Sequence, residues 1–118
     1  MSAYTPVCRL EQLPVERGVA ALIDGEQVAL FRTTDDRVHA LDNRDPFSGA
    51  MVLARGIVGS RGDSATVASP MFKQVFDLAS GICLDDPGVA VPAYPVRVCD
   101  GYVEVSLVQP PTSSRRPA

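Results

Sequence analysis

The chain has 118 residues, which is enough for one domain and too short for two. Its net charge of −3 argues against nucleic acid as a partner. No apolar run is long enough for a membrane helix and residues 1–6 lack a signal-peptide pattern, so we expect a cytoplasmic protein that does not engage a membrane.

Short strands are predicted along most of the chain, because apolar residues alternate with polar ones between turn signals. The predicted strands are 5–10, 19–23, 27–31, 38–41, 57–58, 65–68, 75–78 and 82–84. The pair Asp24-Gly25 predicts a tight hairpin whose two arms are almost continuously apolar, as in strands covered on both faces. One short helical fragment is expected near 50–54, and Gly-rich turns are expected at 59–63 and 79–81.

The last predicted unit is a hairpin that turns at Asp100-Gly101. This register pairs Val96 with Val105 on one face, and Arg97 with Glu104 on the other. An apolar pair on one face and an ion pair on the other are typical of a half-buried antiparallel ribbon. With about ten short strands in all, the sequence predicts an all-β antiparallel sandwich or barrel.

The end of the sequence, residues 109–118, is rich in Pro, Ser, Thr and Arg. Such a segment cannot bury a core, so we expect a disordered tail after a folded domain at residues 1–108. The three cysteines are far apart, and the only histidine, His39, lies inside a predicted strand. We therefore expect free buried thiols and a structural histidine.

Two segments, residues 41–50 and 68–78, interrupt the strand pattern in a similar way. Each leaves a strand, passes a proline and carries an aromatic residue a few positions later. They resemble the two cluster-binding loops of Rieske ferredoxin domains, in which a Cys-x-His pair and a Cys-x-x-His pair hold a [2Fe–2S] cluster. The resemblance implies a Rieske-like fold with a cluster-site subdomain. The loop frame matches at Asn43, Pro46, Gly49, Ala50, Pro70, Phe76, Asp77, Leu78 and Gly81.

The four positions that correspond to cluster ligands hold other residues. They are Asp45 and Phe47 in the first segment, and Ser69 and Phe72 in the second. Phenylalanine has no donor atom, and Asp and Ser are hard oxygen groups that suit an iron–sulfide centre poorly. We therefore expect no catalytic residue and no cofactor-binding or metal-binding residue in this chain.

An intact loop frame with lost ligands resembles the small subunit of assimilatory NAD(P)H-dependent nitrite reductases. Residues 40–50 and 69–74 look like that family's own signatures, and the resemblance covers roughly residues 7–105. It implies a non-catalytic subunit of an oxidoreductase that reduces nitrite to ammonium. The chain would bind or stabilise a large subunit that carries FAD, sirohaem and a [4Fe–4S] cluster.

Six residues of the two segments are candidates for contact with that partner: Arg44, Pro46, Phe47, Met71, Phe72 and Lys73. We call these six residues the tip. The large apolar side chains of the tip either fill the volume that a cluster would occupy or stay exposed and dock on the partner. Two other functions stay open here: a [2Fe–2S] electron-transfer ferredoxin with unorthodox ligands, and a free-standing Rieske-shaped binding module of another complex.

Overall fold

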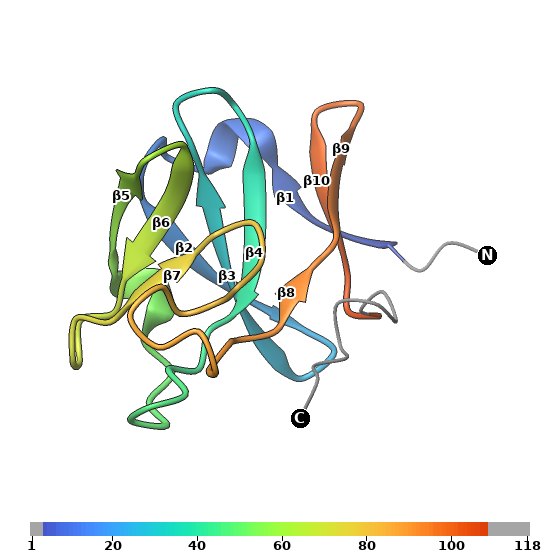
Figure 1. Cartoon of the computed structure of the whole chain (residues 1–118). Helices are drawn as coiled ribbons and strands as arrows, with labels where there is room; N and C mark the ends of the chain where they lie inside the picture. The colour runs from blue at the N-terminus through green and yellow to red at the C-terminus, as the bar shows by residue number, and fades with distance from the viewer. Residues whose placement is uncertain (1–3, 109–118) are drawn as a thin grey trace.

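The computed structural model describes residues 4–108, so the predicted tail at 109–118 lies outside the described residues. The described part holds ten strands in three antiparallel sheets, with two one-turn 3₁₀ helices, which confirms the all-β prediction (Figure 1). No helix within this part is long and apolar enough to cross a bilayer.

Only the third sheet is made of strands that follow one another directly in sequence, whereas the other two also join strands from distant parts of the chain. The first sheet contains β1 (Tyr4–Arg9), β10 (Tyr102–Ser106) and β9 (Val96–Cys99), in that order. The second contains β2 (Gly18–Ile23), β3 (Glu26–Arg32), β4 (Val38–Asp42) and β8 (Ala93–Tyr94). The third contains β5 (Ile57–Arg61), β6 (Ser64–Ala68) and β7 (Val75–Asp77). The 3₁₀ helices are η1 (Leu10–Gln12) and η2 (Leu53–Arg55).

Both predicted Asp-Gly hairpins form with the expected turns. Asp24 and Gly25 have φ values of 49° and 83°, and Asp100 and Gly101 repeat this with 52° and 81°. In the second hairpin the predicted pairing is confirmed, and the Arg97 guanidinium donates to Glu104 Oε1 at 2.6 Å.

Four local predictions were wrong, all of them in short segments. Residues 82–84 form only isolated bridges, and the predicted helical fragment at 50–54 is replaced by η2. The helix starts late because residue 51 pairs back with residue 44 across a loop. Strand β5 runs on to Arg61, since Gly62 alone, with φ of 64°, supplies the left-handed turn residue. Strand β8 was not predicted.

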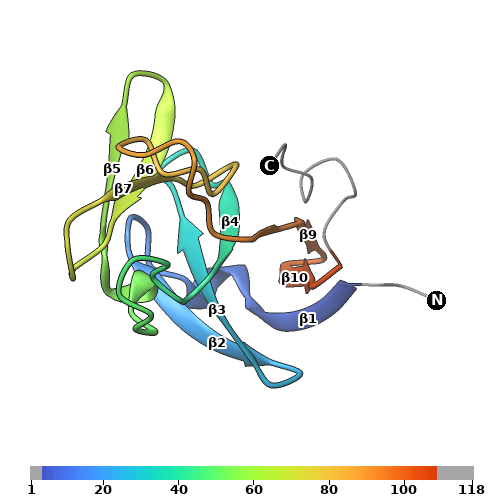
Figure 2. The same cartoon turned by 60° about the horizontal axis from the view of Figure 1, so that its bottom comes forward.

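The second sheet lies between the other two and carries a core on each face (Figure 2). Strand β3 serves both cores: Ala29 and Phe31 face the third sheet, while Val28 and Leu30 face the first. All four side chains are buried, which explains why this strand reads as a continuous apolar run.

The two segments that interrupt the strand pattern emerge at the same end of the molecule. The first loop (residues 43–52) follows β4 and leads into η2, and the second loop (residues 69–74) joins β6 to β7. In Figure 1 both lie at the lower left, while the β3–β4 turn and the β5–β6 turn lie at the opposite end. The fold thus brings together the two segments that the sequence singled out.

Candidate functional site

The two loops close with the same pattern of backbone hydrogen bonds. The pattern starts at Asp45 in the first loop and at Ser69 in the second. The backbone N–H of this residue donates to the carbonyl five positions later, and its own carbonyl accepts from the N–H four positions later. The residue at the fourth position has a positive φ, 80° at Gly49 and 64° at Lys73. The bonds are Asp45 to Ala50 at 2.8 Å and Gly49 to Asp45 at 2.7 Å, and Ser69 to Gln74 at 2.9 Å and Lys73 to Ser69 at 3.0 Å.

A hydrogen bond joins the loops at the positions where Rieske domains have cysteines. The Ser69 hydroxyl donates to Asp45 Oδ2 at 2.5 Å, and both side chains are buried. Asp45 Oδ1 accepts from the backbone N–H groups of Phe47 at 2.8 Å and Ser48 at 3.3 Å. A buried carboxylate with three donors is a satisfied structural group, and here it holds the two loops together.

Asn43 fixes the base of the first loop. Its side chain is almost fully buried, and its Oδ1 accepts from the Ala54 N–H at 2.7 Å. Its Nδ2 donates to Gln27 Oε1 at 3.2 Å. Asn43 therefore ties the loop to β3 on one side and to η2 on the other, which accounts for its place in the loop frame.

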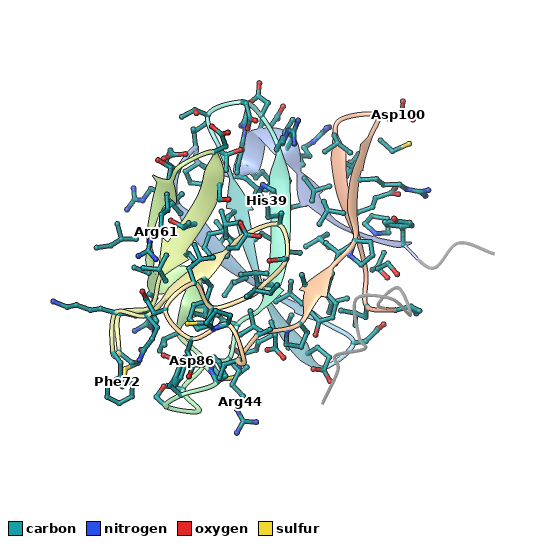
Figure 3. All side chains as sticks on the ribbon, viewed as in Figure 1. His39, Arg44, Arg61, Phe72, Asp86 and Asp100 are labelled. Atoms are coloured by element: carbon teal, nitrogen blue, oxygen red, sulfur yellow. The ribbon has the colours of Figure 1, made fainter. Side chains whose placement is uncertain are left out.

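The two positions equivalent to histidine ligands differ in exposure. Phe47 is half-buried and packs on Phe76 of the core, with ring centroids 6.2 Å apart. Phe72 is 59% exposed and its neighbour Met71 is 47% exposed. Figure 3 shows Phe72 pointing outward at the end of the second loop. Phe47 follows Asp45 by two residues, whereas Phe72 follows Ser69 by three. The two aromatic side chains therefore occupy different positions within otherwise similar loops.

The remaining tip residues are exposed. Arg44 and Pro46 lie on the first loop and Lys73 on the second. The Arg44 guanidinium lies beside the backbone of Gly49, because a Cβ built at that glycine would be 3.6 Å from its Nη2. Met51, which pairs with Arg44 across the loop, is also exposed and was not among the predicted tip residues.

His39 lies away from the loops, as its sequence context predicted. It lines a polar cleft at the opposite end of the molecule. Burial lowers the pKa of His39, and the carboxylates of Asp35 and Asp77 oppose this effect only in part. Burial therefore favours the neutral form of this histidine.

The comparisons with known proteins identify the family. The sequence matches the family model described as the Rieske-like [2Fe-2S] domain over residues 3–106. The nitrite reductase (NADH) small subunit of Escherichia coli (strain K12) is 41% identical over 106 residues, which cover 89% of this chain and 98% of that protein. The chain belongs to the nitrite reductase small-subunit family. The function predicted from the sequence, a small subunit of nitrite reductase, is thereby confirmed.

A solved structure supports this assignment at the level of the fold. The solution structure of the nitrite reductase [NAD(P)H] small subunit from Erwinia carotovora is 43% identical and superposes with a TM-score of 0.78. The alignment covers 93% of this chain and 85% of that one. The Rieske-like fold predicted from the loop frame is confirmed.

One relative carries a similar sequence inside a much longer chain. The nitrite reductase [NAD(P)H] large subunit of Klebsiella oxytoca is 42% identical over 106 residues, which cover 90% of this chain and 11% of that protein. In that polypeptide a homologue of the whole domain is covalently part of the large subunit.

The residues present do not fit the [2Fe–2S] cluster for which the wider family is named. Phe47 and Phe72 have no donor atom, and the oxygen atoms of Asp45 and Ser69 are already engaged with each other. No group of three or more His, Cys, Asp or Glu side chains within residues 4–108 is placed to hold a metal ion. Of the four ligand positions, Asp45 and Ser69 join the loops, Phe47 packs on the core, and Phe72 is exposed.

Sequence reasoning located the loops but missed the bond between them. Asp45 and Ser69 were singled out only as poor ligands, although an acid and a hydroxyl at two buried equivalent positions are a chemically matched pair. That match was the available signal. Asn43 was recognised as part of the loop frame, but its contacts with β3 and η2 depend on tertiary structure.

Proposed function

We propose that this chain is a docking subunit that binds the large subunit of nitrite reductase through the tip and carries no electrons itself. The observation that carries the proposal is the Ser69–Asp45 bond beside the exposed Met71 and Phe72. At the place where a ferredoxin would hold its cluster, the chain has a hydrogen bond that joins the two loops and an exposed apolar surface.

The geometry of the loops supports a role in recognition. Their internal hydrogen bonds hold the backbone in one conformation, so little conformational entropy is lost on docking. Aromatic and methionine side chains are enriched at protein–protein interfaces relative to the rest of the surface. The tip thus offers preorganised apolar anchors, with Arg44 and Lys73 beside them.

The Klebsiella polypeptide supports the large subunit as the partner. A domain that is fused to a protein in one organism and separate in another commonly contacts that protein in both. In this proposal the large subunit carries FAD, sirohaem and a [4Fe–4S] cluster, and reduces nitrite to ammonium with NADH or NADPH in the cytoplasm. The small subunit contributes binding and stabilisation, and its folded domain is residues 1–108.

Binding to the purified large-subunit holoenzyme tests the proposed surface. The double variant M71S/F72S should bind at least about tenfold more weakly than the wild type, because it removes two apolar anchors. V98S is the matched control, since Val98 is 45% exposed, close to the 47% of Met71, and lies on β9. Equal affinity of M71S/F72S and wild type would overturn the tip as the docking site.

Iron content tests the absence of electron transfer. The chain purified anaerobically should be colourless and contain neither iron nor acid-labile sulfide in stoichiometric amount. A brown preparation with both would overturn the proposal and favour a ferredoxin.

A further inference from the structure

The charged side chains around the two loops and those that line the cleft at the opposite end differ in sign. At the end formed by the two loops, the exposed cations Arg44, Arg55 and Lys73 form no salt bridge with any carboxylate of residues 4–108. Four other arginines do form such pairs: Arg32 with Asp36, Arg37 with Asp35, Arg61 with Asp85, and Arg97 with Glu104.

The three unpaired cations lie next to exposed apolar side chains. Lys73 follows Phe72 directly, and Figure 3 shows Phe72 and Arg44 at the same end of the molecule. Arg55 ends η2 two residues before Ile57, which is 78% exposed. Ile57 pairs with residue 68, immediately before the second loop. The apolar side chains therefore have a rim of positive charge.

Carboxylates are fewer on this exposed surface. The segment that follows residue 83 contributes Asp85 and Asp86, and Figure 3 places Asp86 at the same end. Asp85 is engaged by Arg61 at 3.4 Å and by the Val75 N–H at 2.9 Å. The exposed surface of the two loops, η2 and residues 84–88 therefore has three unpaired cations and one unpaired carboxylate, Asp86. A second carboxylate, Asp42, directly precedes the first loop, and its Oδ1 accepts from the Arg44 backbone N–H at 3.1 Å.

The charged side chains that line the cleft at the opposite end are mainly acidic. The cleft that contains His39 is lined by four carboxylates. Its one cationic lining residue, Arg37, is already paired with Asp35. The carboxylates belong to Glu16, Asp35, Asp63 and Asp77.

We propose that the tip and its basic rim fit an apolar pocket on the large subunit whose rim carries Asp and Glu side chains. This rests on the proposed function, and it adds the chemistry of the receiving surface. A carboxylate rim attracts the loop end and repels the cleft end, so the small subunit approaches with its tip forward. Charges at an interface rim act mainly on the association rate and on its salt dependence.

Charge reversal at the rim tests this pocket. K73E and R44E should each lower the association rate constant with the large-subunit holoenzyme by about tenfold at low salt, with little change in the dissociation rate. K73Q and R44Q should show roughly half of this effect on a logarithmic scale. R9E is the matched control: it changes the net charge equally, and Arg9 lies on β1 over the ring of Tyr102, 5.0 Å from its centroid.

Measurements at different salt concentrations separate the electrostatic contribution from the apolar one. The differences between the rim variants and wild type should shrink to within about twofold near 0.5 M salt, where the Debye length is only about 4 Å. The effect of M71S/F72S should persist at every salt concentration, because apolar contacts are not screened.

The two proposals fail in different ways. If K73E and R44E associate as fast as wild type or faster while M71S/F72S binds weakly, the acidic rim is overturned and the docking tip stands. If R9E slows association as much as the rim variants, net charge is responsible and the acidic rim is again overturned. If M71S/F72S binds as tightly as wild type, the docking tip itself is overturned.

Discussion

Ser69 and Asp45 are 24 residues apart in sequence, yet the hydroxyl of one lies 2.5 Å from the carboxylate of the other. They occupy the positions at which a Rieske domain would bind one iron through two cysteines. A single charge-assisted hydrogen bond therefore links the loops where a cluster links them in ligand-bearing relatives.

Removal of this bond should destabilise the domain. S69A deletes the hydroxyl donor and should lower the free energy of unfolding by about 1–3 kcal/mol. D45A leaves the Ser69 hydroxyl and the N–H groups of Phe47 and Ser48 without their acceptor, so its effect should be at least as large. D45N keeps an acceptor for the backbone donors and should fall between D45A and wild type. Urea unfolding followed by far-UV circular dichroism measures all three; a wild-type value for D45A would contradict the structural role.

The two ligand-position phenylalanines should respond differently to truncation. F47A removes a ring that packs on Phe76 and should cost about 1–3 kcal/mol of unfolding free energy. F72A removes an exposed ring and should change stability by no more than about 0.5 kcal/mol. Chemical denaturation of both variants under identical conditions makes the comparison. Similar losses for the two would show that Phe72 also packs into the fold.

Protonation of His39 should make the fold weaker in mild acid. Burial lowers its folded-state pKa below the ordinary value of 6.5, while the unfolded chain keeps that value, so the unfolded state binds more protons as pH falls. The stabilising contribution is complete above the unfolded pKa and is lost as pH falls below it toward the folded pKa.

The variant H39Q isolates this titration, because the chain has no other histidine. Its unfolding free energy should vary less than that of wild type between about pH 7.5 and pH 5. Denaturation curves across this range provide the measurement. An unchanged pH slope in H39Q would assign the acid sensitivity to other groups.

Gly56 should not tolerate even one added methyl group. A Cβ at this position would lie 2.4 Å from the carbonyl oxygen of Ala68 and 2.6 Å from Cγ2 of Val67. Because backbone must move, G56A should lose about 1–3 kcal/mol or more. In G59A the nearest atom is Thr66 Oγ1 at 3.8 Å, so this control should lose little. Thermal unfolding distinguishes the two, and equal midpoints would contradict the close approach of residues 56 and 68.

The sequence was most informative where structure is local. The Asp100-Gly101 turn specifies both its φ values and the register of β9 with β10. The sequence could not show that Val98 would remain 45% exposed. This exposure follows from the position of β9 at the edge of its sheet, which depends on the tertiary structure. Strand β8 was missed for a related reason: it has two residues, lies between prolines, and exists only through its pairing with β4.

The candidate site was predictable in position and less so in internal arrangement. The loop frame located the two loops, and the missing donors at Phe47 and Phe72 followed from residue chemistry. Which ring turns inward depends on the loop conformation, and that is fixed partly by a bond between residues far apart in sequence. Such a bond forms only after both loops have been placed by their sheets.

The pairing of β1 with β10 places Tyr4 opposite Ser106, so the two ends of the described domain lie side by side. In Figures 1 and 2 this sheet lies on the other side of the molecule from the two loops. A polypeptide joined at either residue would leave the loops uncovered. A domain with this arrangement can be a separate chain or one segment of a much longer chain. In both cases it presents the same surface of the two loops.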